Sequence, residues 1–281
     1  EEPETPEEPE TPVEPETPAA TGTFTAATYN VDGLPKKISF FTINGDGPGS
    51  DGTKTISSAI AADNWDFFGF SEDFAYHKEL TSSLGGYTFG TYRGSVSSIS
   101  KNNTDGLGFA VNNSTCSFSN ENIVKFTSSA GGITSGANTC IYKGFRHYVV
   151  TLADGTETDV LITHMNTYDT QKHLDCQHKQ LQEVATWIAN HRNGRPVIFM
   201  GDTNCRYTRH DFETYFWSII RAEGITINDP WVDFQGNGVY PAYPSKSLMV
   251  SDATGTNSST DIICSTTQNG EVVDKIIYIN D

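Results

Sequence analysis

The sequence predicts an α/β protein built from two packed sheets with helices on their outer faces. Two observations predict this class: segments rich in β-branched and aromatic residues recur along the chain, and helical apolar periodicity is interspersed among them. Many strands with several helices bury their apolar faces well in such a layered arrangement. The 281 residues suffice for one sizeable core, so we expect one domain over 24–281 and a tail over 1–23.

The tail is a Pro/Glu/Thr repeat that holds eight Glu and no Lys, Arg or Asp. Proline removes helix donors and like charges repel, so the tail is predicted to be an extended, solvated spacer. Such spacers often follow an exported N-terminus, so we expect an extracellular, periplasmic or cell-surface protein. A lipid anchor upstream is left open. No apolar run is long enough to span a bilayer.

The net charge of the chain is −17, and without the tail it is −9. An acidic domain has no general attraction for nucleic acid, whose phosphates are bound mainly through Lys and Arg. Nucleic acid is therefore a less favoured partner, although a local basic groove is not excluded.

The expected strands are runs of β-branched and aromatic residues that end in polar residues. In chain order they read FTAATYNV, WDFFGFSE, YTFGTYR, GLGFAVN and, near the end, EVVDKIIYIN. The segment FRHYVVTLADGTETDVLITHMN predicts a β-hairpin, because residues 153–156 carry turn chemistry between two strand-like runs.

Two helices are predicted. In HLDCQHKQLQEVATWIANHR the apolar residues share one face, and in HDFETYFWSIIRAEG they follow helical spacing until Gly224 gives a stop signal. On the first helix, His173 and His178 are five residues apart, which is the wrong spacing for a shared metal. We expect both to be solvated.

Two loops are also predicted. Residues 45–55, GDGPGSDGTKT, superficially resemble a phosphate-binding loop, but Thr53 interrupts the required Gly-Lys pair, so a flexible loop near the pocket is expected. Cys116 and Cys140 bracket a polar Gly/Ser/Asn-rich stretch that is typical of a disulfide-closed loop in an exported protein. Two unrelated buried thiols are the alternative.

Polar side chains recur where the predicted strands end. They are Asn30, Glu72, His164 with Asn166, and Asp202 with Asn204, while Asp274 lies within the last strand. Each one alone is typical of a turn or of a hydrogen-bonded surface residue. Together, if the strand ends converge, they form a pocket of carboxylates, amides and one imidazole, which suits metal-assisted phosphoester hydrolysis. No G-x-S-x-G motif occurs, which removes the simplest serine hydrolase.

The residue types predict separate roles. A hard cation such as Mg²⁺, with Mn²⁺ or Ca²⁺ as alternatives, prefers oxygen ligands, so Glu72 with Asn30 is the expected metal pair. Asp202 and Asn204 stand at i and i+2 and point the same way on an extended segment. Asp202 can then orient or deprotonate a water, while Asn204 and His164 donate hydrogen bonds to phosphoryl oxygens.

The motifs TYNVDGLP, FGFSEDFAYH, LITHMN, VIFMGDTN and VVDKIIY stand in the order found in the endonuclease/exonuclease/phosphatase superfamily. The chain resembles this superfamily from about Phe24 to Tyr278, and most closely a secreted branch of phosphodiesterases or sphingomyelinase-like proteins. The resemblance implies a four-layer α/β/β/α sandwich. It also implies the metal and catalytic roles above, with Asp274 as a supporting carboxylate.

One departure from the superfamily's pattern concerns its final Ser-Asp-His motif, which follows the strand matched by VVDKIIY. The sequence reaches Asp281 without this motif, and SDAT at Ser251 precedes that strand and has no His. We expect a truncated sequence, because a sandwich that stops at this strand leaves apolar surface open. A non-catalytic binding module at the cell surface is the alternative.

The remaining predictions concern individual side chains and the substrate. Arg206 and Arg209 follow the Asp202 motif and are expected, with Asn166, to bind substrate, although exposed loop arginines are the alternative. His147 has a slight claim to the site, and Asp274 could instead form an ion pair with Lys275. The expected protein is a monomer that hydrolyses phosphodiesters, with a phospholipid head group as leading substrate and a nuclease second.

Overall fold

The computed structural model describes residues 23–98, 103–131, 140–167, 170–207, 210–236, 238 and 273–280. Its strands are β1 (Ala26–Asn30), β2 (Lys37–Ile38), β3 (Phe41–Thr42), β4 (Phe67–Ser71), β5 (Tyr87–Phe89), β6 (Gly108–Asn112), β7 (Cys116–Lys125), β8 (Gly144–Leu152), β9 (Glu157–His164), β10 (Val197–Asp202), β11 (Thr226–Asn228) and β12 (Asp274–Asn280). Its helices are α1 (Gly49–Asp63), α2 (His77–Leu80), α4 (Gln171–His191), the π-helical turn η2 (Glu213–Trp217), α5 (Ser218–Ala222) and α6 (Pro230–Gly236).

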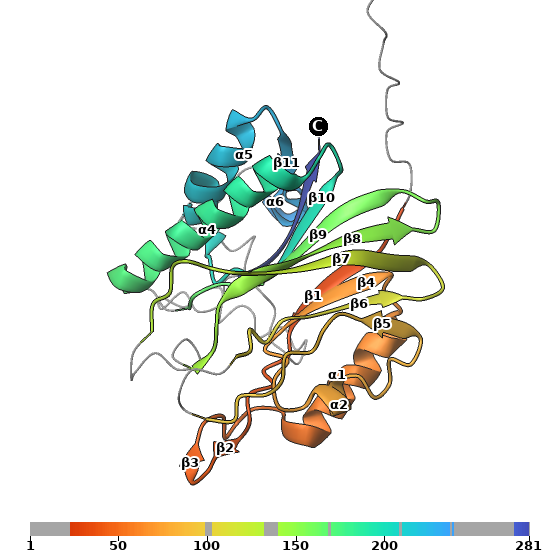
Figure 1. The fold of residues 1–281 in the computed structure, drawn as a ribbon, viewed down its shortest axis with the longest axis vertical. Coiled ribbons are helices and arrows are strands. Elements are labelled where there is room, and N and C mark those ends of the chain that lie inside the picture. The colour runs from red at the N-terminus through yellow and green to blue at the C-terminus, as the bar shows by residue number, and fades with distance from the viewer. Residues whose placement is uncertain are drawn as a thin grey trace, which may run out of the picture.

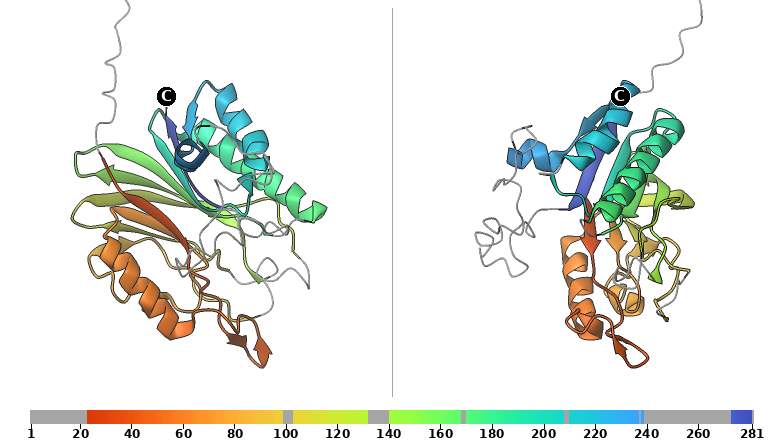
Figure 2. Two further views of the ribbon diagram at one scale, coloured as in Figure 1. Left: turned by 180° about the vertical axis from the view of Figure 1, so that it is seen from behind. Right: turned by 90° about the vertical axis from the view of Figure 1, so that its left-hand side faces the viewer.

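The strands form two mixed sheets that pack face to face. One sheet has the order β1-β4-β6-β5, the other has the order β11-β12-β10-β9-β8-β7, and β2 and β3 form a separate ribbon. Helices α1 and α2 cover the outer face of the first sheet, and α4 and α5 cover the outer face of the second (Figures 1 and 2). The predicted α/β class with helices outside two sheets is therefore confirmed.

A core of aromatic and branched side chains fills the space between the sheets. Phe67 and Phe109 of the first sheet meet Tyr148, Ile162 and Met200 of the second, and all five are fully buried. The rings of Phe109 and Tyr148 stack with centroids 4.3 Å apart. This packing fixes how the two sheets face each other, and so which strand ends lie together.

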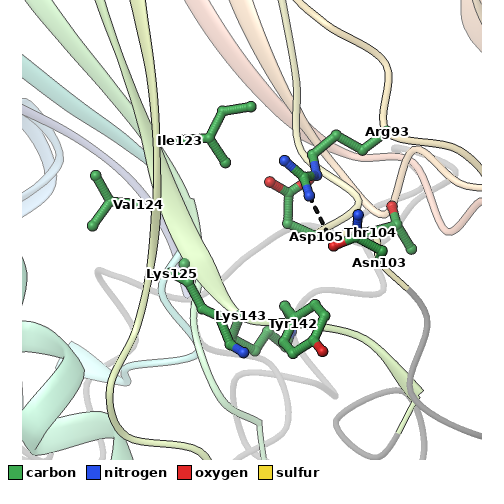
Figure 3. Close-up of a pocket in the computed structure, with 10 residues that line it drawn as sticks. Arg93, Asn103, Thr104, Asp105, Ile123, Val124, Lys125, Tyr142 and Lys143 are labelled. Carbon is green, nitrogen blue, oxygen red and sulfur yellow. Dashed lines mark hydrogen bonds between the residues drawn. The ribbon is translucent and has the colours of Figure 1, made fainter.

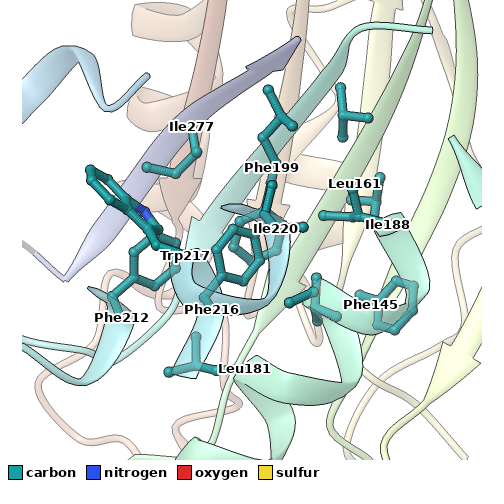
Figure 4. Packing of buried hydrophobic residues seen from close by; sticks show 14 of the residues in the cluster. Phe145, Leu161, Leu181, Ile188, Phe199, Phe212, Phe216, Trp217, Ile220 and Ile277 are labelled. Atoms are coloured by element: carbon teal, nitrogen blue, oxygen red, sulfur yellow. The ribbon is translucent and has the colours of Figure 1, made fainter. Parts of the chain in front are cut away.

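A second core lies between α4, η2, α5 and the outer face of the larger sheet (Figure 4). Phe199 of β10 stacks on Phe216 with centroids 5.0 Å apart, and Leu181 and Ile188 of α4 close the cluster. The two helices predicted from apolar periodicity are confirmed, although the second begins with a π-helical turn. Within the described residues, no helix has the length and hydrophobicity required to span a membrane.

The predicted flexible loop over 45–55 is wrong in its second half, because α1 begins at Gly49. Besides Gly49 at its start, α1 buries Thr53, Ser57 and Ile60. Two of these are hydroxyl residues with hydrogen-bond partners: Thr53 Oγ1 donates to the Gly49 carbonyl oxygen at 2.6 Å, and Ser57 Oγ accepts from the Ser83 N–H at 3.0 Å. Polar side chains on the buried face hide the apolar periodicity that would have predicted this helix.

The predicted disulfide between Cys116 and Cys140 is also wrong, because the structure does not join these two residues. The polar stretch that begins at Cys116 is strand β7, in which Cys116 pairs with Leu152 and Lys125 pairs with Gly144. Cys140 lies just before Gly144, at the far end of β7. The nine residue steps from Cys116 to Lys125 span about 30 Å. This is far beyond the Cα separation that a disulfide bridges.

Candidate active site

Five polar side chains from both sheets meet at one edge of the sandwich. Asn30 ends β1, and Glu72 directly follows β4, which runs parallel to β1. In the other sheet, Asp202 at the end of β10 pairs with His164 of β9 on one side and with Asp274 of β12 on the other. The predicted convergence of strand ends therefore occurs.

Hydrogen bonds join the two sheets at this edge. The Asn30 amide donates from Nδ2 to Asp202 Oδ2 at 2.9 Å and to Glu72 Oε1 at 3.2 Å. His164 Nε2 lies 3.6 Å from Asp202 Oδ2 and 3.9 Å from Glu72 Oε1. These four side chains come from four different strand ends, and they form a cluster small enough to hold one phosphoryl group.

Unusual backbone conformations place two of these groups. Glu72 has a φ of 63° and Asn204 a φ of 52°, both in the left-handed region that non-glycine residues seldom adopt. At Asn204 the turn is held by its own N–H, which donates to Asp202 Oδ1 at 2.9 Å. Strain of this kind persists only where the surroundings impose it, and it is concentrated at functional sites.

Gly201 allows β10 to approach β9 closely just before Asp202. Its φ is 131°, and a Cβ built there would lie 2.1 Å from the Thr163 carbonyl oxygen. Only glycine fits this position. The close approach of the two strands therefore explains why the VIFMGD motif has glycine directly before Asp202.

The charges of the cluster are crowded and partly desolvated. Burial raises the pKa of Glu72, and neighbouring Asp202 adds to the rise, while Lys143 and the Asn30 hydrogen bond oppose it. Burial, followed by repulsion from Asp202, raises the pKa of Asp274 to about 7. Burial also lowers the pKa of His164 to about 3, so its imidazole is neutral at physiological pH.

The donor set fits a divalent cation bound through few protein ligands. The carboxylate of Asp274 has one buried oxygen, Oδ1, with no hydrogen-bond partner, and Glu72 and Asp202 add further negative charge. Among the described residues, no three His, Cys, Asp or Glu side chains group tightly enough to hold a metal alone. Mg²⁺ commonly uses one or two carboxylates with waters and substrate phosphate, so Glu72 beside Asn30 suits it.

Asn166 and Asn204 lie beside the cluster, but both amides already have protein partners. Asn204 Nδ2 donates to the Met165 carbonyl oxygen at 3.2 Å. Asn166 Nδ2 lies 2.7 Å from His173 Nδ1 and 2.8 Å from the Thr167 carbonyl oxygen. The side-chain Oδ1 of Asn166 is buried without a hydrogen bond.

The expectation that His173 and His178 are solvated is wrong. His173 is buried against Asn166, as described above. His178 pairs with Asp211 at 3.1 Å and stacks on the Tyr215 ring with centroids 3.9 Å apart. Helix α4 packs against the strand ends and η2, so these positions face the protein.

Comparison with known proteins gives a consistent picture. No protein-family model matches the chain. It is 26% identical over 225 residues to proteins named sphingomyelinase in Mycobacterium tuberculosis (strain ATCC 25618 / H37Rv) and Mycobacterium bovis. The match covers 79% of this chain and 41% of each relative, so the chain spans less than half the length of these relatives.

Solved structures extend the similarity to the whole layered arrangement. A humanized TDP2 of D. rerio matches with a TM-score of 0.61 and 17% identity over 92% of this chain and 83% of that one. A beta toxin variant from Staphylococcus aureus matches with a TM-score of 0.59 and 16% identity, over 92% and 87%. Sphingomyelinase C from Streptomyces griseocarneus matches with 0.58 and 15%, over 92% and 84%.

These relatives and structures are all members of the endonuclease/exonuclease/phosphatase superfamily. The chain has the fold of this superfamily. Its four layers follow from that fold: the helices of Figure 1 flank two sheets whose strand ends carry the polar cluster.

Lys275, the alternative ion-pair partner of Asp274, attracts that carboxyl electrostatically and opposes the rise in its pKa, but the hydrogen bond and the ring contact of its ammonium are with other residues. Successive residues of a strand point to opposite faces, and Lys275 Nζ donates to the Cys205 carbonyl oxygen at 2.7 Å and lies 3.7 Å from the Tyr207 ring centre. His147 lies away from the cluster, because its Nε2 pairs with Asp159 at 2.6 Å further along β8 and β9.

The other predicted residues have mixed outcomes. Arg206 lies partly buried, in the segment after Asn204. Arg209, the tail, Ser251 and the stretch around it fall outside the described residues, so the predictions about them stay predictions.

Sequence reasoning missed Lys143, a buried residue that acts electrostatically on both Glu72 and His164. Its only sequence signal is a Lys-Gly pair before a strand. The importance of that pair depends on the pairing of Gly144 with His164, which requires the register of the sheet.

Proposed function

We propose that residues 24–281 form a divalent-metal-dependent phosphodiester hydrolase. One observation carries the proposal: Glu72 Oε1 and Asp202 Oδ2 lie 3.9 Å and 3.6 Å from His164 Nε2, although the three residues are remote from one another in sequence. A carboxylate pair beside a neutral imidazole, desolvated at the edge of a rigid sandwich, suits attack of water on a phosphorus centre. The similarity to sphingomyelinases supports the same reaction class.

Each side chain has a distinct task in this proposal. Glu72 beside Asn30 would hold the cation, which would supply positive charge to neutralise the phosphoryl oxygens. Asp202 accepts a hydrogen bond from the attacking water and takes its proton as the new P–O bond forms. The P–O bond to the leaving alcohol breaks, and the proton held by Asp202 is returned to the departing oxygen through solvent. Neutral His164 donates its ring N–H to a phosphoryl oxygen. Asn30 holds the carboxylates of Glu72 and Asp202 in a fixed relation through its two hydrogen bonds.

Phosphodiesters are the proposed substrate class, with the head group of a phospholipid first, in an exported protein that contains the Pro/Glu/Thr spacer. The sphingomyelinase relatives support this order. Nucleic acid is the second proposed substrate, because a domain with a net charge of −9 provides no general electrostatic attraction for a polyanion.

The test begins with bis(4-nitrophenyl) phosphate, assayed with Mg²⁺ and with EDTA. We expect turnover with Mg²⁺ only, and a fall in kcat of about a hundredfold or more in Asp202→Asn and in His164→Ala. Asp175→Asn, on the exposed face of α4, is the matched control and should leave kcat unchanged.

A panel of sphingomyelin, single-stranded DNA and inositol phosphates then orders the substrates. Faster cleavage of DNA than of lipid would reverse the proposed order. Full activity in Asp202→Asn would overturn the assigned site, and a chain that cleaves no phosphodiester at all would overturn the hydrolase and favour the alternative of a surface binding module.

A further inference from the structure

A small cavity opens next to the catalytic cluster, on the side of β7 and β8. It measures about 190 Å³ and is lined by ten residues from three segments: Arg93, Asn103, Thr104 and Asp105 of one loop, Ile123, Val124 and Lys125 of β7, and Tyr142, Lys143 and Gly144 before and at the start of β8 (Figure 3). Two lining residues connect the cavity to the candidate site: Gly144 is the strand partner of His164, and Lys143 acts electrostatically on both Glu72 and His164.

The cavity is basic in a chain that is otherwise acidic. Three of its ten lining residues are cationic, Arg93, Lys125 and Lys143. Its single carboxylate, Asp105, is already neutralised from outside the cavity, because Arg146 donates to it from Nη2 at 2.7 Å and from Nε at 3.1 Å. Against a net charge of −17 for the whole chain, this concentration of positive charge requires a local explanation.

Two of the cationic groups are held in place by neighbours. The Lys125 ammonium lies 3.5 Å from the centre of the Tyr142 ring, a cation–π contact. The Arg93 guanidinium donates from Nη2 to Asn103 Oδ1 at 3.0 Å, which Figure 3 shows as a dashed line. A guanidinium uses only one of its five N–H groups in that bond and has further donors for an anion.

We propose that this cavity, lined by Arg93, Lys125 and Lys143, binds a second anionic group of the substrate, such as a phosphate monoester. The inference rests on the proposed hydrolase function and narrows it. The preferred substrate is a phosphodiester that carries a further phosphate near the scissile bond. A cationic head group such as choline fits this cavity poorly, since three cations would repel it.

Soluble matched substrates test the inference, because they remove effects of membrane surface charge. One pair is glycerophosphoglycerol with and without a terminal phosphate, which stands for a lipid head group. The other is the dinucleotide TpT with and without a 5′-phosphate, which stands for nucleic acid. In whichever of these two pairs the protein hydrolyses, we expect kcat/KM to be at least about tenfold higher for the phosphorylated member. This is the gain that one additional charge-assisted hydrogen bond provides.

Variants of the cavity residues test whether the cavity causes the preference for the phosphorylated substrate. Arg93→Ala and Lys125→Ala should remove most of it while leaving turnover of bis(4-nitrophenyl) phosphate, which has no second anion, unchanged. Lys54→Ala is the control, because Lys54 is an exposed lysine of α1 that pairs only with exposed Asp51 in the described contacts. It removes the same charge far from the cavity.

Calorimetry with inorganic phosphate in EDTA separates this inference from the proposed function. Binding to the wild type that weakens at least tenfold in both cavity variants supports the anion site, even if no diester is hydrolysed. The inference is overturned if phosphate binds equally to wild type and both variants, or not at all. Equal kcat/KM for both members of each pair, with bis(4-nitrophenyl) phosphate turned over normally, would also overturn it and leave the hydrolase standing.

Discussion

Asp202 of β10 faces Asp274 of β12 directly across the antiparallel ladder, so two carboxylates share one end of the larger sheet. Glu72 brings a third acidic group to the same edge from the smaller sheet. Proteins seldom collect buried negative charge without a compensating cation. This crowding is the physical basis for the metal in the proposed function.

Replacing Glu72 with Gln separates charge from hydrogen bonding. Gln still accepts the bond from Asn30, but it removes one of three crowded charges. In EDTA we expect Tm to stay the same or rise. The rise in Tm produced by Mg²⁺ should shrink, because ligand stabilisation follows the ratio of concentration to Kd. Differential scanning fluorimetry measures both, with Glu157→Gln as an exposed control. A lower Tm in EDTA, with the full Mg²⁺ response retained, would contradict the assignment.

Gly201→Ala tests the close approach of β10 to β9. A methyl group there meets the Thr163 carbonyl oxygen and requires a φ that alanine disfavours. We expect the free energy of unfolding to fall by at least about 2 kcal/mol. Urea denaturation measures it. Gly85→Ala is the matched control, since a Cβ at Gly85 meets nothing within 4 Å. Equal stability of the two variants would show that the strand yields at this point.

Gln180 of α4 supports the segment that follows His164. Its Oε1 accepts from the Asn166 N–H at 2.8 Å and its Nε2 donates to the Ser128 carbonyl oxygen at 3.0 Å. Gln180→Leu leaves the buried Asn166 N–H and the partly buried Ser128 carbonyl oxygen without this partner, so we expect a loss of about 1–3 kcal/mol, mostly from the buried N–H. The exposed neighbour Gln182 gives the control Gln182→Leu. Chemical denaturation that finds the two variants alike would refute this role.

Glu121 predicts a pH dependence of stability. Burial by itself would raise the pKa of this carboxyl, but hydrogen bonds from Thr91 and Tyr148 outweigh burial and hold it below the ordinary value of 4.5. A carboxyl with a depressed folded pKa stabilises the protein above pH 4.5, and this contribution is lost as the pH falls through the folded value.

Glu121→Gln should therefore be less stable than wild type at pH 7, and the difference should shrink below pH 4.5. Urea denaturation at a series of pH values measures it, with Glu157→Gln as the control. A difference that is constant with pH would mean that the charge of Glu121 contributes nothing.

The sequence predicts those parts of the fold in which the apolar pattern is visible. Strand β4 and helix α4 are examples, since the FFGF run of β4 is continuous apolar sequence and α4 has a regular buried face. Helix α1 escapes prediction because Thr53 and Ser57 occupy its buried face. Strand β7 escapes because an edge strand with one exposed side has a polar sequence, which resembles a loop.

The candidate site likewise contains some residues that the sequence predicts and others that it does not. Glu72, His164 and Asp202 stand at the ends of apolar strands, so their positions could be predicted from sequence. The part played by Lys143 could not, because it depends on which strand lies beside β9 and in what register. The burial of His173 escapes prediction for a related reason. Its ring contacts Asn166, which lies on a segment that α4 packs against.

The hydrogen bond from Asn30 to Asp202 has a mechanical consequence. It is a bridge between two separately hydrogen-bonded sheets, so the reactive geometry depends on how those sheets sit against each other. Displacement of one sheet by a single residue, about 3.3 Å, would break the bridge and part the carboxylates. Substitutions deep in the interface, such as at Phe109 or Tyr148, are therefore expected to abolish the proposed activity from a distance while leaving every polar group of the cluster chemically intact.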